Sequence, residues 1–251
     1  MSDDWPGEAF FTLHHDLPRE GPGEAADVAW AVSLAGLRPD GVVCDAACAT
    51  GGDIAALLDA VPKGRVVGFD LHQGFVDTAG RRFAQDPRVN VLQGQLIRHG
   101  DGDLPDPRDL VPFDLIWCAG ACNFEGVTEC LEAWKTALRP GGAVAFSEVA
   151  WFHPEPPEEV RAFWAEYPAM TDEAGVTARI EAAGYEILGQ RRLSDAAWEA
   201  YYRPLDQRVA ALRPTVDAEL AEVLDASDEE ARMWRTYRDV FGYVLSVVRP
   251  R

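Results

Sequence analysis

Two acidic residues end two short apolar runs, and a loop of small residues lies between them. Asp45 follows Val-Val-Cys, and Asp70 follows Val-Val-Gly-Phe. The loop at residues 45–52 lets a ligand approach the backbone, and a helix that begins near Gly51 favours an anionic group such as a carboxylate. Asp70 is placed to accept hydrogen bonds from both hydroxyls of a ribose. The spacing therefore predicts a binding site for a nucleoside that carries a small anionic group.

The loop sequence discriminates only partly between two classes of nucleoside cofactor. A dinucleotide site prefers Gly-x-Gly-x-x-Gly, and the corresponding positions here are Ala47, Ala49 and Gly52. A pyrophosphate needs the close approach that the second glycine allows, and Ala49 obstructs it. The carboxylate of S-adenosylmethionine is smaller and tolerates alanine better. The loop therefore favours S-adenosylmethionine and leaves a nicotinamide cofactor open.

Alternating strands and helices would place the two acids at one edge of a sheet. The helix predicted over 51–61 has an apolar stripe at helical spacing. Another helix is predicted to end at Arg139-Pro-Gly-Gly142, a helix-breaking sequence. Such alternation predicts an α/β fold with a Rossmann-like, doubly wound sheet, whose ligands bind at the carboxyl ends of the strands. Apolar runs predict the strands at 41–45, 65–70, 88–92, 113–118, 143–147, 184–191 and 241–248.

The pattern changes after residue 150. Residues 156–167 have an aromatic helical face, and a second helix is predicted to end near Ala183. Residues 194–238 are predicted as a helical insertion before the last strand. Within it, Ser227-Asp-Glu-Glu230 has the pattern of a capping box and predicts a helix start. No linker interrupts the chain, so residues 1–251 are interpreted as one domain.

Composition excludes several classes of function. The 23 Lys and Arg residues against 42 Asp and Glu residues give a net charge of −19, which disfavours nucleic acid. The N-terminus has no signal-like pattern and no long apolar run exists, so no membrane association is predicted. The five cysteines are interpreted as reduced thiols of a cytoplasmic protein. Cys118 and Cys122 lack the close spacing of zinc ligands, so no metal is predicted.

Several segments in series resemble a known family. Val42-Val-Cys-Asp45 with its loop, Val-Val-Gly-Phe-Asp70, Phe113-Asp-Leu-Ile-Trp-Cys118 and Leu138-Arg-Pro-Gly-Gly142 resemble the ordered motifs of class I S-adenosylmethionine-dependent methyltransferases. The resemblance extends to bacterial small-molecule members related to the ubiquinone and menaquinone methyltransferases. Those also have segments similar to Arg19-Glu-Gly-Pro-Gly23, Ser147-Glu-Val-Ala-Trp-Phe152 and Trp198-Glu-Ala-Tyr-Tyr-Arg-Pro204.

The resemblance implies a fold and a cofactor site. It implies a seven-stranded sheet, mostly parallel with the last strand antiparallel. Residues 1–40 would form a cofactor lid and a helix, and residues 41–150 the cofactor-binding core. The cofactor would be S-adenosyl-L-methionine, released as S-adenosyl-L-homocysteine. Its expected contacts are Arg19 and Gly23 in the lid, Asp45, Ala47, Cys48, Ala49 and Gly51 at the methionine end, Asp70 and Leu71 at the ribose, Gln95 and Leu96 at the adenine, and Cys118 and Ala119 near the methyl group.

The chain departs from the family pattern at three positions. Ala47 and Ala49 stand where the family has glycine, and Gln95 stands where it has an acid. These departures motivate a non-catalytic S-adenosylmethionine-binding protein as an alternative to an enzyme. A nicotinamide-dependent oxidoreductase is a weaker alternative.

Residues for the methyl acceptor are predicted from position and chemistry alone. The acceptor is expected to be a small molecule, and a homodimer is left open. Aromatic residues near the insertion would suit a planar acceptor or a cation held against ring faces. The candidate catalytic bases are His15 and His153, and the candidate acceptor contacts are His14, Asn123, Trp151 and Tyr201.

Overall fold

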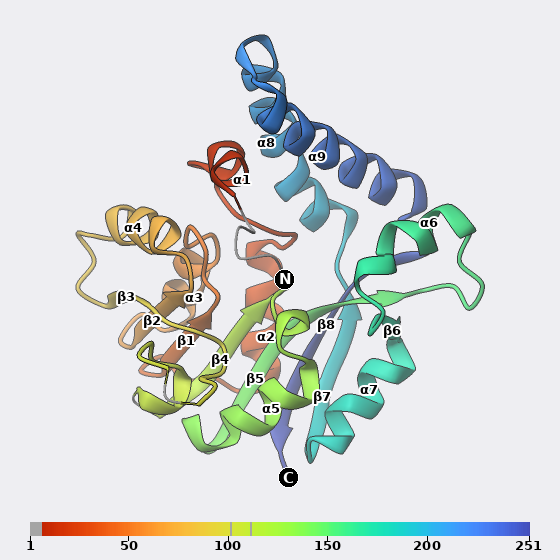
Figure 1. Ribbon diagram of the computed structural model, residues 1–251. Helices are drawn as coiled ribbons and strands as arrows, with labels where there is room; N and C mark the ends of the chain where they lie inside the picture. Colours follow the sequence, from red (N-terminus) through yellow and green to blue (C-terminus); the bar gives the residue numbers. More distant parts are fainter. Residues whose placement is uncertain (1–6, 101, 111) are drawn as a thin grey trace.

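The computed structural model describes residues 7–100, 102–110 and 112–251, and its centre is a mixed β-sheet (Figure 1). Strands follow one another in the order β3-β2-β1-β4-β5-β8-β7, and the short β6 pairs with β5. β8 runs antiparallel to both β5 and β7, whereas the other pairs are parallel. The strands are β1 (Val42–Ala46), β2 (Arg65–Asp70), β3 (Val89–Gln93), β4 (Phe113–Ala119), β5 (Leu138–Trp151), β6 (Thr171–Asp172), β7 (Tyr185–Arg192) and β8 (Phe241–Pro250).

The predicted fold is confirmed, including the antiparallel last strand, and the two-residue β6 adds to the seven predicted strands. The central strands are apolar throughout because helices cover both faces of the sheet. All five residues of β1 are buried, and so are the last five of β2. The carboxyl ends of β1, β2 and β4 therefore meet at one edge of the sheet.

Helices form a layer on each face. α2 (Ala25–Ala35) and α3 (Ile54–Ala60) share one core with Val43 and Leu115, and α4 (Gln73–Arg82) packs against β2 and β3. On the opposite face, α5 (Val127–Trp134) and α7 (Glu173–Ala182) pack against Phe146 and Val248. This arrangement leaves the carboxyl edge of the sheet between the layers.

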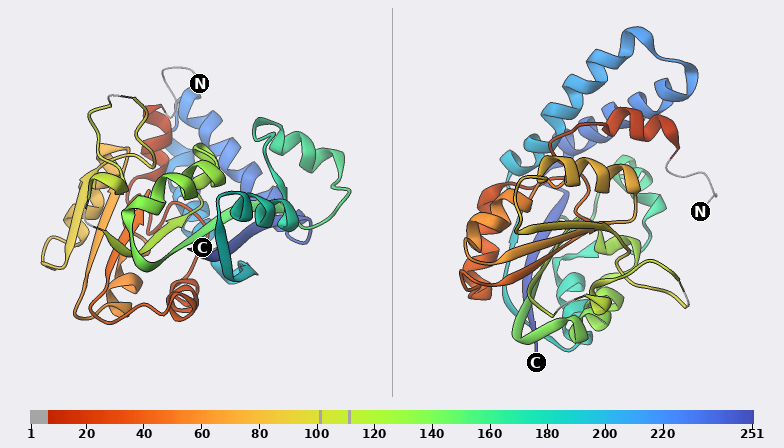
Figure 2. Two further views of the ribbon diagram at one scale, coloured as in Figure 1. Left: turned by 90° about the horizontal axis from the view of Figure 1, so that it is seen from below. Right: turned by 90° about the vertical axis from the view of Figure 1, so that its left-hand side faces the viewer.

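A third group of helices lies beyond that edge (Figure 2). α8 (Asp195–Leu212) and α9 (Ala218–Tyr237) form an antiparallel pair, and α1 (Glu8–His14) packs against both. α6 (Glu158–Phe163) continues into a single 3-10 turn at Trp164–Glu166. These elements share an aromatic core with the start of β8. Because it lies over the carboxyl edge, this group is placed to cover a ligand bound there.

One local prediction is wrong. Ser227-Asp-Glu-Glu230 lies inside α9, whose actual start is capped by the Asp217 side chain accepting from the Leu220 N–H at 2.9 Å. The helix predicted to end at Arg139-Pro-Gly-Gly142 does end before it: α5 ends at Trp134, a 3-10 turn follows at Lys135–Ala137, and β5 begins at Leu138. Within the described residues, no helix is both long enough and apolar enough to cross a membrane.

Candidate active site

Asp45 carries a buried carboxyl group with an unused oxygen. Its side chain is 3% exposed at the end of β1, and Oδ2 has no hydrogen-bond partner among the described residues. Burial raises the pKa of Asp45 well above its usual value, and the neighbouring Asp53 and Asp70 raise it further, while Arg19 lowers it. A buried acceptor without a donor is unfavourable. A ligand that brings an N–H or O–H group to this edge would satisfy it.

The loop after Asp45 has a backbone that suits glycine. Ala47 has φ +57° and Ala49 has φ +46°, both in the left-handed region. This conformation costs an L-residue about 1–2 kcal/mol, so the loop stores strain at the two positions where the family pattern has glycine. The loop is tied to the end of β2, since the Cys48 N–H donates to the Phe69 carbonyl at 2.9 Å.

The Asp70 side chain is hydrogen-bonded to the same loop. Its Oδ2 accepts from the Ala49 N–H at 3.0 Å, and its Oδ1 accepts from the His72 N–H at 2.9 Å. Burial raises the pKa of Asp70, and these two hydrogen bonds oppose that shift. A carboxylate has about four acceptor positions, so it keeps capacity for two hydroxyl donors. Beside it, Leu71 is 52% exposed and offers an apolar surface at the sheet edge.

The segment around Arg19 closes over the loop. Arg19 Nη2 lies 3.2 Å from Asp53 Oδ1, and the Thr50 hydroxyl donates to the Leu17 carbonyl at 3.1 Å. A side chain at Gly23 or Gly52 would clash with Arg19. A Cβ on Gly23 would lie 2.3 Å from Arg19 Nη2, and a Cβ on Gly52 would lie 2.8 Å from Arg19 Cβ. The structure therefore brings Arg19 and Gly23 together with the Asp45 loop.

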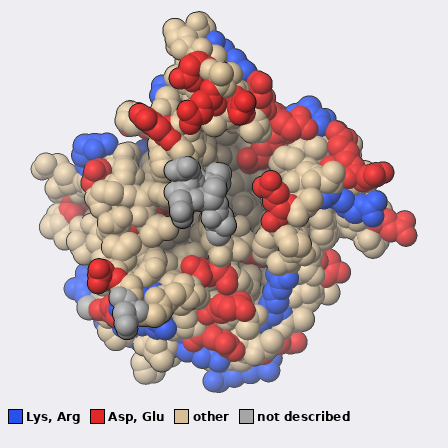
Figure 3. Space-filling model, in the orientation of Figure 1, with Lys and Arg blue, Asp and Glu red and all other residues tan. Residues whose placement is uncertain are grey.

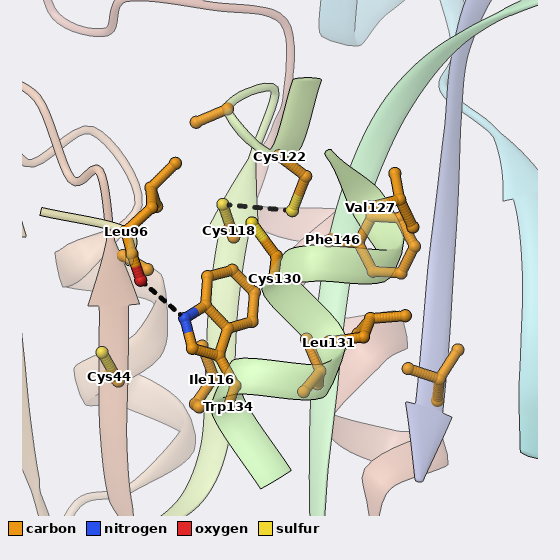
Figure 4. Close-up of a cluster of buried hydrophobic side chains, with 14 of the residues drawn as sticks. Cys44, Leu96, Ile116, Cys118, Cys122, Val127, Cys130, Leu131, Trp134 and Phe146 are labelled. Carbon is orange, nitrogen blue, oxygen red and sulfur yellow. Dashed lines mark hydrogen bonds between the residues drawn. The ribbon is translucent and has the colours of Figure 1, made fainter. Parts of the chain in front are cut away.

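The residues predicted near the adenine and the methyl group differ in whether their side chains can reach a ligand. The Gln95 amide donates to the Leu104 carbonyl at 3.1 Å, which leaves its carbonyl oxygen to accept from an adenine amino group. Leu96 and Cys118 lie in the core, where the Trp134 indole donates to the Leu96 carbonyl at 2.9 Å and Cys118 Sγ lies 3.6 Å from Cys122 Sγ (Figure 4). Their side chains are therefore directed into the core, and only their backbones could line a ligand.

Ala119 and the remaining cysteines complete this part of the site. Ala119 is half-buried at the end of β4 and packs against the core on the α2 and α3 face. All five cysteines are buried and free of disulfides. Among the described residues, no group of three or more His, Cys, Asp or Glu side chains is placed to hold a metal ion.

Only one of the three singled-out histidines lies in a buried cluster. His14 is 6% exposed, and its Nδ1 lies 2.5 Å from Glu20 Oε2. His15 is exposed and pairs with Asp16 at 2.9 Å. His153 is also exposed, and its Nδ1 accepts from the Glu155 N–H at 3.2 Å. The structure thus brings His14, and neither His15 nor His153, into contact with a buried acid.

The predicted acceptor contacts are spread over three elements. Asn123 is half-buried in the 3-10 turn at Cys122–Phe124, and Trp151 is half-buried at the end of β5. Tyr201 is 7% exposed and lines a cavity of about 80 Å³. Of these three residues, only Tyr201 lines that cavity. Its other lining residues are Glu20, Gly21, Pro22, Phe163, Trp164, Trp198, Tyr202, Glu230, Phe241 and Tyr243.

The sequence analysis missed three acids near this edge, which the fold partly or fully buries. Glu20 and Glu230 line the cavity. Glu148 is 1% exposed and accepts from the Tyr167 hydroxyl at 2.6 Å, and burial raises its pKa to about 7. Glu20 and Glu148 stand inside the quoted Arg-x-Gly-Pro-Gly and Ser-Glu segments, which could have pointed to them. No local pattern marks Glu230.

Known proteins are similar to this chain over part of its sequence. Residues 43–142 match the model of a family described as a methyltransferase domain. The demethylmenaquinone methyltransferase of Symbiobacterium thermophilum is 33% identical over 109 residues, which are 42% of this chain and 41% of that protein. The 2-phytyl-1,4-naphtoquinone methyltransferase of Synechococcus elongatus is 33% identical over 123 residues, 47% of this chain and 50% of that protein. The chain thus spans half or less of the length of these curated relatives.

A solved structure extends the likeness to the whole fold. The S-adenosylmethionine-dependent methyltransferase of Geobacter sulfurreducens, crystallised with S-adenosyl-L-homocysteine, superposes with a TM-score of 0.76. The match covers 97% of this chain and 98% of that one at 20% identity, so it establishes the fold. Residues 43–142 therefore resemble a methyltransferase domain, and the whole chain shares the fold of an S-adenosylmethionine-dependent methyltransferase.

Proposed function

We propose that this protein transfers a methyl group from S-adenosylmethionine to a small-molecule acceptor by direct displacement. The observation that carries the proposal is the buried Asp45 carboxyl, whose Oδ2 lacks a partner at the end of β1. The amino group of a methionine moiety is a donor of the right kind for that oxygen. The quinone methyltransferases among the relatives support the same class of reaction.

The neighbouring residues fit the rest of the cofactor. The loop of Ala47, Cys48, Ala49 and Gly51 would hold the methionine end, and Asp70 would accept from the ribose hydroxyls. Leu71, exposed beside Asp70, would contact the ribose, and the carbonyl oxygen of Gln95 would accept from the adenine amino group. Arg19 would cover the site and balance the charge of the buried acids, as its contact with Asp53 indicates.

Positioning is the main catalytic task of such a site. When bound, S-adenosylmethionine supplies an electrophilic methyl group on a positively charged sulfur. The protein must hold the acceptor atom in line with the carbon–sulfur bond and exclude water. The Arg19 segment covers the loop from one side, and the aromatic core of α8, α9 and β8 lies over the sheet edge. These elements would enclose both reactants.

A non-catalytic S-adenosylmethionine-binding protein is the second candidate. The strained backbone at Ala47 and Ala49 favours it, because a loop that departs from the family's glycines need not hold the cofactor in a reactive geometry. Formation of S-adenosylhomocysteine distinguishes an enzyme from a binding protein. A binding protein would hold the cofactor without forming S-adenosylhomocysteine in the presence of any acceptor.

Calorimetric titration tests the cofactor assignment. The purified chain is titrated with S-adenosylmethionine, S-adenosylhomocysteine and NADH, and binding of only the first two is expected. Asp70→Ala should weaken that binding at least tenfold, whereas Asp40→Ala, at a side chain 61% exposed, should leave it unchanged. Binding of NADH alone, or equal affinities in the wild type and Asp70→Ala, would overturn the assignment.

We also propose a cytoplasmic location, because all five thiols are free. Disulfides persist in oxidising compartments and are rare in the cytoplasm.

A further inference from the structure

The cavity of about 80 Å³ adjoins the proposed methyl-transfer position. Its walls come from four places: the segment at Glu20–Pro22, helices α8 and α9, the turn at Trp164, and the start of β8. On β8, Tyr243 reaches toward β4, since a Cβ on Gly120 would lie 3.1 Å from the Tyr243 hydroxyl. Gly120 directly follows Ala119, so the cavity lies beside the carboxyl end of β4.

Two carboxylates line this cavity, Glu20 from the segment before α2 and Glu230 from α9. Glu20 is nine-tenths buried: its Oε2 contacts His14 at 2.5 Å, whereas its Oε1 has no partner among the described residues. Glu230 is half-buried and accepts from the Tyr202 hydroxyl at 3.1 Å. The pKa of each is raised, with burial as the largest cause. The cavity therefore holds more acceptor capacity than its own walls satisfy.

The rest of the wall is aromatic and rigid. Trp198 stacks on Trp234 with ring centroids 5.0 Å apart and on Tyr243 with centroids 5.1 Å apart. Trp164 contacts Phe241 edge to face at 5.4 Å. Aromatic walls with carboxylates recognise organic cations, because the rings attract the charge and accommodate its alkyl groups. A hydrated metal ion would instead need a wall of oxygen ligands.

The pocket also offers one unpaired donor. Trp164 Nε1 is buried and has no partner among the described residues. A neutral planar acceptor without a hydrogen-bond donor could use the Trp164 N–H and the ring faces, but it would bring no donor to Glu20 Oε1. A buried carboxylate oxygen without a donor is unfavourable. The two acids therefore favour a cation that also carries an acceptor such as a hydroxyl.

Resting on the proposed methyl transfer, we propose that this cavity is the acceptor pocket and that the acceptor is a small organic amine, bound as its ammonium cation. Glu20 and Glu230 accept from its N–H groups, and the aromatic walls surround its carbons. Before transfer, one of these carboxylates takes a proton from the ammonium, and the freed nitrogen lone pair then forms the N–C bond to the methyl group. The C–S bond of S-adenosylmethionine breaks in the same step, and S-adenosylhomocysteine leaves.

The surface around the pocket supports a cationic ligand. The chain carries a net charge of −19, and many Asp and Glu side chains lie on the face shown in Figure 3, especially in its upper part. Much of this acidic surface lies over α8 and α9, the two helices that form one wall of the cavity. Such a surface raises the local concentration of cations and speeds their arrival.

Two isosteric probes separate charge from shape. N,N-dimethylethanolamine is protonated near neutral pH, and isoamyl alcohol has the same outline with carbon in place of nitrogen. Binding of each is measured by calorimetry and by quenching of tryptophan fluorescence, with and without S-adenosylhomocysteine. We expect the amine to bind at least tenfold more tightly than the alcohol. Equal affinities of the two probes would overturn the proposal.

Variants locate the effect at the two carboxylates. Glu230→Gln and Glu20→Gln should each bring the two affinities within about threefold of one another. Glu229→Gln, next in sequence but exposed and paired with Arg232, should keep the tenfold preference. If one variant fails to fold, the proposal is judged from the other variant, by comparing its ratio of amine affinity to alcohol affinity with that of the wild type. A tenfold preference retained in both would place the amine elsewhere and refute the assignment.

The cofactor titration keeps this result separate from the proposed function. S-adenosylhomocysteine binding without amine preference overturns the pocket assignment alone. Amine preference without S-adenosylhomocysteine binding supports the pocket and overturns the proposed methyl transfer.

Discussion

Replacing Ala47 and Ala49 by glycine should stabilise the protein, although each change removes a side chain. Both residues have φ in the left-handed region, at +57° and +46°. That conformation costs alanine about 1–2 kcal/mol, and glycine avoids the cost. Glycine in turn gives the unfolded chain more freedom, which costs about 0.5–1 kcal/mol. The net gain is about 0.5–1 kcal/mol for each position.

The assay is thermal and urea unfolding of the single and double variants. The double variant should gain about 1–2 kcal/mol, and a chain of this size should gain about 2–8 °C in Tm. Ala226→Gly is the matched control, because Ala226 is exposed inside α9, where glycine should destabilise by about 0.5–1 kcal/mol. Affinity for S-adenosylmethionine should stay equal or increase. Destabilisation of Ala47→Gly and Ala49→Gly by the same amount as the control would refute the reasoning about this loop.

Two further predictions concern titratable side chains. Burial raises the pKa of Glu148 from 4.5 to about 7, so the fold favours its protonated form. That stability is present below about pH 4.5 and is lost as pH rises through 7, by about 3 kcal/mol. Glu148→Gln should therefore lose less stability than the wild type between pH 5 and pH 8 in urea unfolding, and identical pH dependence would contradict this. His15→Ala and His153→Ala should keep methyl transfer to N,N-dimethylethanolamine within about twofold, because both histidines are exposed; a hundredfold loss in either would restore its predicted role as a base.

The sheet was predictable because its pattern is local. Each buried strand is a short apolar run, and the acids at Asp45 and Asp70 end two of them. A parallel α/β arrangement then fixes where those ends meet. The departures from the family pattern were visible in the sequence as well, and the structure shows that both alanines have positive φ.

The acceptor pocket could not be predicted in the same way. Glu20 and Glu230 are separated by most of the chain, and they meet only because α1, α8 and α9 pack together over the sheet edge. Ser227 shows the opposite error, because a capping pattern can occur inside a long helix such as α9. A local pattern predicts an element, whereas a pocket depends on how elements pack.

A crystal structure with S-adenosylhomocysteine would show whether the cofactor binds at the carboxyl ends of β1 and β2. We expect its ribose hydroxyls on Asp70, its amino group within hydrogen-bond distance of Asp45, and its sulfur directed toward the cavity beside Gly120 and Tyr243. A ligand bound away from the ends of β1 and β2, or none bound at saturating concentration, would contradict this expectation.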